Sequence, residues 1–174
     1  GMNYMAHYFE NDDSLKSEEL MKEVIIGDKR YQFITDNGVF SKKGLDFGTR
    51  TLLESLDLSK ISGNVLDMGC GYGPIGIYVA DNTDASVHMV DVNNRSLNLA
   101  IKNANLNKVN VNIYESNAYE NIHKKFNYII SNPPIRVGKK ILYQILFDTK
   151  KYLNKNGQLW IVIHKDQGAK SVMK

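Results

Sequence analysis

Two short segments of the chain combine residue types that could hold a ligand against the main chain and orient a polar group. The first is Asp67-Met68-Gly69-Cys70-Gly71-Tyr72-Gly73-Pro74-Ile75-Gly76, and the second is Asn132-Pro133-Pro134-Ile135. Glycine permits positive φ angles and lets a ligand approach the backbone closely. Two successive prolines fix an extended backbone without donating an N–H group. The oxygens of Asn132 and of the carbonyls beside it are therefore expected to be rigid acceptors for a planar NH2 group.

The glycine-rich segment predicts a site for a ligand that contains a nucleoside. Residues 71–76 match the pattern G-x-G-x-x-G, and Asp91 follows about twenty residues later. A carboxylate at that place can accept hydrogen bonds from ribose hydroxyls. Two plainer interpretations stay open: a tight strand-to-helix turn that binds nothing, and an Asp91 that only caps the helix beginning near Asn93.

Asp67 favours S-adenosylmethionine over NAD as that ligand. A carboxylate directly before the glycines would repel a pyrophosphate, but it suits an ammonium and a sulfonium group. An NAD oxidoreductase is further disfavoured because we find no proton-donor signature in the chain. Asn132-Pro133-Pro134 could still be a simple strand terminator.

The elements that must position these residues alternate between strand and helix after residue 63. Hydrophobic patterns predict strands at 64–68, 86–92, 109–114, 126–131 and 158–164, and helices at 74–82, 94–107 and 139–153. This alternation indicates an α/β fold, a doubly wound and mostly parallel sheet. Ligands bind such sheets at the carboxyl ends of the strands, where Asp67, Asp91, Asn117 and Asn132 are all expected to lie.

The remaining chain is organised around this sheet. Residues 1–18 are interpreted as a flexible arm, and 19–174 as one domain with a β-hairpin extension at 19–36. A helix with Leu45, Leu52, Leu53 and Leu56 on its apolar face then leads to the first strand of the sheet.

Composition excludes several classes of protein. The formal net charge of +3 permits a nucleic-acid partner without requiring one, and a single cysteine excludes an intrachain disulfide. We expect no membrane span, no metal site and a cytoplasmic location.

At these motifs the chain resembles class I S-adenosylmethionine-dependent methyltransferases. Residues 65–73 are similar to their motif I, and 132–135 to the N-P-P-aromatic motif of enzymes that methylate exocyclic amines. Residues 36–49 and 132–139 resemble the small methyltransferase domain of the bacterial 16S rRNA (guanine-N2)-methyltransferase C type. This fold usually ends in an antiparallel hairpin, for which the chain leaves no room, so we expect a truncated domain whose edge strand favours self-association.

The resemblance implies roles for particular residues. The cofactor-binding set would be Phe40, Asp46, Gly48, Thr49, Asp67, Gly69, Gly71, Tyr72, Gly73, Asp91, Val92, Asn117 and Asn132. Asp91 would bind the ribose, Val92 would pack on the adenine, and Asn117 would accept from the adenine amine. Phe40, Asp46, Gly48 and Thr49 would close over the cofactor.

The same resemblance implies that Asn132, Pro133 and Pro134 orient the target amine, and that Ile135, Arg136 and Lys139 contact the substrate. Ile135 replaces the usual aromatic residue, so the base would need another stacking partner, such as Tyr31, Phe33 or an aromatic residue of the arm. His88, inside a strand, is interpreted as structural. His164 could border the site, and Lys140 joins Arg136 and Lys139 as a contact for RNA phosphates or as part of a solvated helix face.

Direct methyl transfer to guanine N2 of ribosomal RNA is the leading hypothesis for the function. Methylation of DNA adenine or of a protein glutamine is an alternative of the same chemistry. A module that binds cofactor or RNA without turnover is an alternative of another class, favoured by Ile135.

Overall fold

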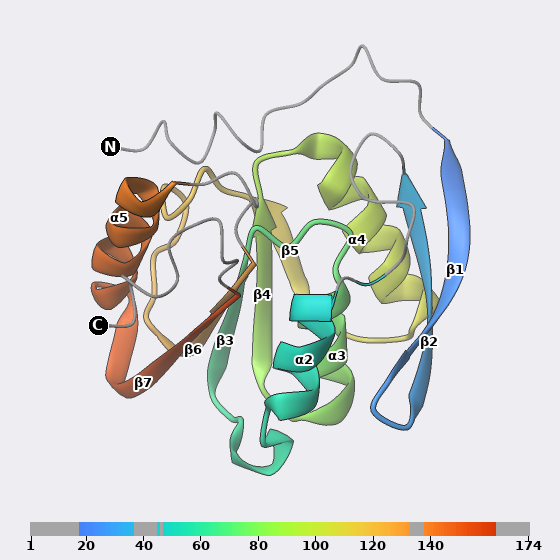
Figure 1. The fold of residues 1–174 in the computed structure, drawn as a ribbon, viewed down its shortest axis with the longest axis horizontal. Helices are drawn as coiled ribbons and strands as arrows, with labels where there is room; N and C mark the ends of the chain where they lie inside the picture. The colour runs from blue at the N-terminus through green and yellow to red at the C-terminus, as the bar shows by residue number, and fades with distance from the viewer. Residues whose placement is uncertain (1–17, 37–44, 46, 133–137, 163–174) are drawn as a thin grey trace.

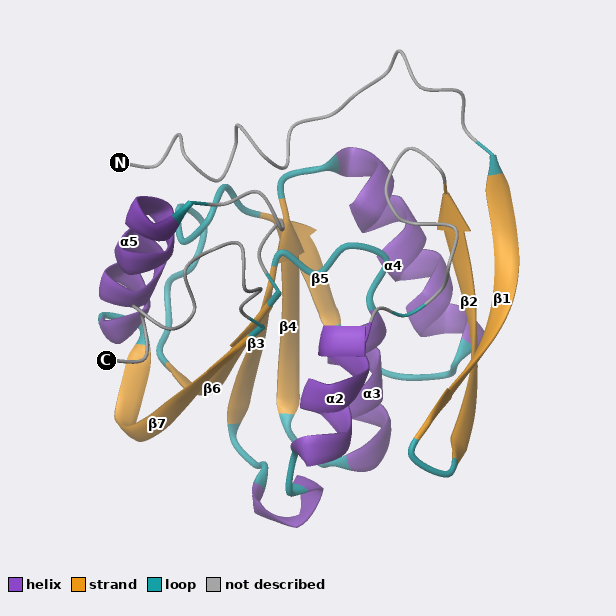
Figure 2. Ribbon diagram, viewed as in Figure 1, coloured by secondary structure: helices purple, strands orange, loops and turns teal. Residues whose placement is uncertain are grey.

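The computed structural model describes residues 18–36, 45, 47–132 and 138–162. Its strands are β1 (Glu19–Ile26), β2 (Lys29–Asp36), β3 (Asn64–Met68), β4 (Ser86–Asp91), β5 (Asn112–Glu115), β6 (Phe126–Ser131) and β7 (Leu153–Ile161). Its helices are α2 (Phe47–Ser55), α3 (Pro74–Asn82), α4 (Asn94–Leu106) and α5 (Lys139–Lys150), with a 3-10 turn at Leu58–Lys60. Figures 1 and 2 show one central sheet with helices around it and a separate two-stranded hairpin.

The central sheet is parallel and has the strand order β5-β4-β3-β6-β7. The chain builds outward from β3 to one side through β4 and β5, and then returns to place β6 and β7 on the other side. The switch point therefore lies between β3 and β6, which is where ligands bind in doubly wound sheets. Met68 is paired with Ser131 in the register of these two strands. The glycine loop and Asn132, which directly follow them, thus leave the sheet as neighbours.

Hydrophobic side chains alternate between the two faces of the sheet. One face packs under α2, α3 and α4, and its core contains Val65, Val87 and Met89. The other face packs against α5 and the segment 116–125, and its core contains Leu66 and Val90. These strands are buried on both faces, which explains their nearly continuous apolar sequence.

The hairpin β1–β2 packs on the outer side of α4 and α3, at the right of Figure 2. Its antiparallel register pairs Ile26 with Lys29 across a turn in which Gly27 has a φ of 62°. Tyr31 and Phe33 of β2 are 4% and 0% exposed. The sequence prediction of a hairpin before the sheet is confirmed, as is the doubly wound fold.

Several predicted boundaries differ from the structure at the ends of the elements. The strand predicted at 109–114 is β5, Asn112–Glu115, because Val109 N–H still bonds to the carbonyl of Ala104 at the end of α4. The helix predicted at 139–153 ends at Lys150, since Leu153 pairs with Phe126 as the first residue of β7.

The last strand was predicted at 158–164 but spans Leu153–Ile161. It continues through Asn156-Gly157, a pair of residues that is typical of turns. Asn156 has a φ of 66°, and the pairing register between β7 and β6 shifts at this place. The strand therefore contains a bulge-like irregularity here instead of ending in a turn. The predicted arm, apart from Glu18, lies outside the described residues, as does His164.

Candidate active site at the carboxyl edge of the sheet

The glycine loop between β3 and α3 takes a conformation that its sequence makes possible. Gly69, Gly71 and Gly73 have φ angles of 72°, 57° and 105°, so every second residue is left-handed. A side chain at these places would cost roughly 1–2 kcal/mol each. The N–H groups of Gly69 and Cys70 both bond to the carbonyl of Val90 at 2.9 Å, which fastens the loop to β4. Pro74 then begins α3, as predicted.

Asp67 lies beneath this loop and is fully buried, with 0% exposure. Its Oδ2 accepts the N–H of Gly76 at 2.9 Å, which ties β3 to the first turn of α3. Gly76 permits this approach because a Cβ there would come within 2.5 Å of the Met89 side chain and 3.1 Å of Asp67 Oδ2. Burial, together with the charge of Asp91, raises the pKa of Asp67 to about 7, against the lowering effect of the Gly76 N–H.

Asp91, at the end of β4, is 3% exposed and holds the loop from the other side. Its Oδ2 accepts the N–H of Gly71, and its Oδ1 accepts the N–H of Asn93, both at 2.9 Å. Burial raises the pKa of Asp91, and the backbone N–H groups oppose this rise. Asn93, rather than Asp91, caps α4, because its side chain accepts the N–H of Ser96. Each carboxylate oxygen has two acceptor sites, so Asp91 retains capacity for ribose hydroxyls.

Asn117 follows β5 at the same edge. The N–H of Ser116 bonds to the carbonyl of Asp91 at 3.1 Å, which brings the two strand ends together. Among the residues that the structure describes, Asn117 Oδ1 and Asp67 Oδ1 are buried oxygens with no hydrogen-bond partner. Such oxygens are uncommon in native proteins, and one explanation for them is a donor supplied by a ligand.

Asn132 follows β6 next to the glycine loop, and its side chain is fixed. Its Nδ2 donates to Oγ1 of Thr49 at 2.7 Å. The backbone just before it is also held, since Ser131 Oγ donates to the carbonyl of Met68 and Val162 N–H donates to the carbonyl of Ser131. Thr49 is 2% exposed and lies on α2, with Gly48 beside it.

Other predicted site residues fall into three groups. Phe40, Asp46, Pro133, Pro134, Ile135 and Arg136 lie outside the described residues. Val92 is half-buried in the bend between β4 and α4, and Lys139 is exposed at the start of α5. Tyr72 is 1% exposed and its ring packs edge-on against Phe33 at 5.5 Å, so only its main chain belongs to the loop surface. The assignment of these residues to a ligand stays a prediction.

Two proposed substitutes for the missing aromatic residue were wrong. Tyr31 and Phe33 stack on each other in the core beneath the hairpin, so neither ring can stack on a base. His88 is structural, as predicted: its Nδ1 lies 3.0 Å from the Tyr114 hydroxyl, and its ring packs on Phe126. Burial lowers the pKa of His88, as does the nearby charge of Lys124.

Asn103 is a residue of this site that the sequence analysis missed. It is 0% exposed on α4, and its Nδ2 donates both to the carbonyl of Tyr72 in the glycine loop at 2.8 Å and to that of Ile34 at 3.0 Å. Its Oδ1 accepts the N–H of Ile34 at 2.7 Å. Asn107, one turn later, makes the same pair of bonds to Gln32. The sequence did contain a signal for this role: Asn103 and Asn107 are four residues apart on the apolar face of a predicted helix.

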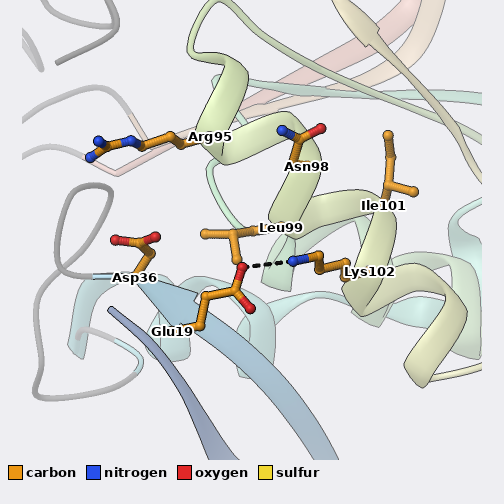
Figure 3. A pocket seen from close by; sticks show the side chains of 7 residues that line it. All are labelled: Glu19, Asp36, Arg95, Asn98, Leu99, Ile101 and Lys102. Atoms are coloured by element: carbon orange, nitrogen blue, oxygen red, sulfur yellow. Dashed lines mark hydrogen bonds and ion pairs between the residues drawn. The ribbon is translucent and has the colours of Figure 1, made fainter. Parts of the chain in front are cut away.

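A pocket of about 320 Å³ lies between the hairpin and α4 (Figure 3). Asp36 and Arg95 lie at one end of it, and at the other end Lys102 and Glu19 form an ion pair of 2.6 Å. None of the residues predicted to bind cofactor lines it. In the described part of the chain, no three His, Cys, Asp or Glu side chains gather as a metal site, and no helix is long and apolar enough to span a membrane.

Comparison with known proteins agrees with this arrangement. Residues 30–174 match the model of the methyltransferase small domain family. The uncharacterised protein YbxB of Bacillus subtilis is 43% identical over 171 residues, which are 96% of this chain and 85% of that protein. The ribosomal RNA small subunit methyltransferase C of Haemophilus influenzae is 39% identical over 130 residues, which are 72% of this chain and 39% of that enzyme.

Among solved structures, the T. thermophilus 16S rRNA N2-guanine methyltransferase, in complex with AdoMet and guanosine, superimposes with a TM-score of 0.75 at 25% identity. The superposition covers 84% of this chain and 42% of that one. The chain thus spans about two fifths of the length of the rRNA methyltransferases that it matches. From the family match and the shared fold together, we conclude that the chain belongs to the methyltransferase small domain family, the S-adenosylmethionine-dependent class that its motifs predicted.

Proposed function

We propose that this chain binds S-adenosylmethionine at the carboxyl edge of its sheet and transfers the methyl group to N2 of a guanine in small-subunit ribosomal RNA. The observation that carries the proposal is the pairing of Met68 with Ser131, which makes the glycine loop and Asn132 neighbours at the switch point. The related rRNA methyltransferases support the choice of substrate. With ribosomal RNA as substrate, the site of action would be the cytoplasm.

The residues at this edge fit the cofactor. Two buried acceptor oxygens, Asp67 Oδ1 and Asn117 Oδ1, have no partner among the described residues. Left-handed glycines keep the loop backbone free of side chains, and two buried carboxyl groups favour a cationic ligand. The glycine loop would hold the methionine part, Asp91 the ribose and Asn117 the adenine. When bound, S-adenosylmethionine supplies a methyl group on a positively charged sulfur, which becomes a neutral thioether after transfer.

Asn132 would act on the other reactant. Its Oδ1 can accept a hydrogen from the target amine, and the carbonyl of Pro133 would accept the second. Holding both hydrogens draws the nitrogen lone pair out of conjugation and directs it at the methyl carbon. The nitrogen gains the methyl group and loses one proton to solvent, so a strong general base is not needed. Catalysis would come from positioning and from the fixed polar groups.

RNA binding would involve the basic residues after the Asn-Pro-Pro motif. Lys139 and Lys140 are exposed in the first turn of α5, which follows the Asn-Pro-Pro motif in the sequence. Contacts with phosphates release counterions, so binding should weaken with rising salt. Reversing both charges should reduce the salt dependence, whereas an unchanged slope would assign these lysines to a solvated helix face.

The test is methyl transfer from labelled S-adenosylmethionine to small-subunit RNA that lacks the modification, with DNA and protein acceptors as parallel substrates. We expect label in the RNA as N2-methylguanine, and a large loss of transfer in N132A with retained cofactor affinity. Calorimetry with S-adenosylmethionine and with NAD provides the control for the ligand. Binding of NAD alone, or full activity of N132A, would refute the proposal. Cofactor binding without transfer to any acceptor would favour the non-catalytic module.

A further inference from the structure

Thr49 and Asn132 form a contact that the proposed chemistry does not by itself require. They lie 83 residues apart, on α2 and directly after β6, and Asn132 Nδ2 donates to Thr49 Oγ1 at 2.7 Å. Thr49 is 2% exposed and Asn132 is half-buried, so this hydrogen bond is partly shielded from water. A partly shielded bond of this length holds an amide in one orientation more firmly than an exposed one. The resemblance to known enzymes implied that Thr49 covers the cofactor. In the structure, Thr49 instead bonds to the side chain of Asn132.

In the structure, the donor end of the Asn132 amide is the end that faces Thr49 on α2. The amide of asparagine has a donor end, the NH2 group, and an acceptor end, Oδ1. With the donor end bonded to Thr49, Oδ1 lies on the opposite side of the Cγ atom. A target NH2 group can be held only by an acceptor, so this is the orientation that the transfer needs. An amide turned by 180° would present its own NH2 group to the substrate and repel it.

The main chain at Asn132 is held as firmly as its side chain. Ser131 is 1% exposed, its hydroxyl bonds to the carbonyl of Met68, and its carbonyl accepts the N–H of Val162. Neighbouring segments on both sides of β6 therefore fix the backbone that carries Asn132. Rotation of its side chain is the motion left to control, and Thr49 is placed to control it.

We propose that Thr49 is a positioning residue for Asn132, holding the amide so that Oδ1 meets the amine to be methylated. The inference rests on the proposed function, in which Asn132 orients that amine. The inference places Thr49 of α2 on the side of the site that binds the amine to be methylated. The sequence resemblance had implied that Thr49 lies on the side that binds the cofactor. A misplacement of about 1 Å in such a group can reduce a rate by about 100-fold.

The test compares T49V, which removes the hydroxyl at nearly constant shape, with T49S, which keeps it. We expect kcat of T49V to fall about 10- to 100-fold, with the dissociation constant for S-adenosylmethionine within about two-fold of wild type. T49S should retain most of the wild-type kcat. In an N132A background, T49V should cause no further loss, because the group that Thr49 positions is already absent.

A readout without turnover separates this inference from the proposed function. The side-chain NH2 signals of Asn132 in a 15N spectrum should shift and exchange faster in T49V, and return toward wild type in T49S. Wild-type protein that transfers no methyl group would refute the proposed function, while the amide signals would still report on the contact. A T49V variant with unchanged kcat and unchanged amide signals, or with weakened cofactor binding at normal kcat, would overturn the positioning role. T49A provides a second variant if T49V does not fold.

Discussion

Replacing Asp67 by asparagine should remove a large part of the pH dependence of the free energy of unfolding. Burial raises the pKa of Asp67 from 3.8 to about 7 in the folded protein. Between these values the folded state keeps a proton that the unfolded state has lost, so the protein becomes less stable as pH rises. Asparagine at this place carries no charge at any pH, and its amide oxygen can still accept the Gly76 N–H.

The size of the effect follows from the two pKa values. At about 1.4 kcal/mol for each pKa unit, the ionisation of Asp67 destabilises the fold by about 4 kcal/mol in total. About 2.5 kcal/mol of this develops between pH 5 and pH 8, and the change levels off above pH 7. The difference in unfolding free energy, D67N minus wild type, should therefore increase by about 2.5 kcal/mol over this interval. Contributions from titrating groups that do not interact with Asp67 cancel in the difference.

Urea denaturation of both proteins at pH 5, 6, 7 and 8 measures this difference. D84N is the matched control, because Asp84 is exposed in the loop between α3 and β4. The difference between D84N and wild type should stay constant with pH. A D67N difference that is equally flat would show that the buried carboxyl group is not protonated near neutral pH, and the reasoning about its burial would be wrong.

Three further substitutions test the glycine loop and the contacts that hold the hairpin against the helices. N103A removes three hydrogen bonds, one buried and two part-buried, that join the hairpin and the glycine loop to α4. It should lower the unfolding free energy by about 2–4 kcal/mol and weaken cofactor binding in calorimetry. G73A places a Cβ at a φ of 105° and within 2.9 Å of Met89 Cε, so thermal unfolding should show a loss of about 1–3 kcal/mol. Y31F removes the hydroxyl that donates to Asp81 at 2.7 Å, and urea denaturation should show a loss of about 1–2 kcal/mol while calorimetry shows unchanged cofactor affinity. Equal cofactor affinity in N103A, or wild-type stability in either of the other two, would contradict these expectations.

The local chemistry of the site could be predicted because it follows from short stretches of sequence. Alternating glycines permit the left-handed loop, and an acidic residue or asparagine at the end of an apolar run marks the edge of the sheet. Element ends depended instead on partners distant in sequence. Leu153 joins β7, for example, because Phe126 pairs with it across the sheet.

Local sequence was sufficient to predict the α/β class, the hairpin, the glycine loop and the presence of Asp67, Asp91 and Asn132 at strand ends, since periodicity and backbone freedom are local properties. The partners of these groups became known from the folded chain. It placed Tyr31 and Phe33 in the core, joined Asn103 to the glycine loop, and brought Thr49 to Asn132. These contacts join segments that are far apart in the sequence, so they depend on how the helices, the hairpin and the sheet pack in space.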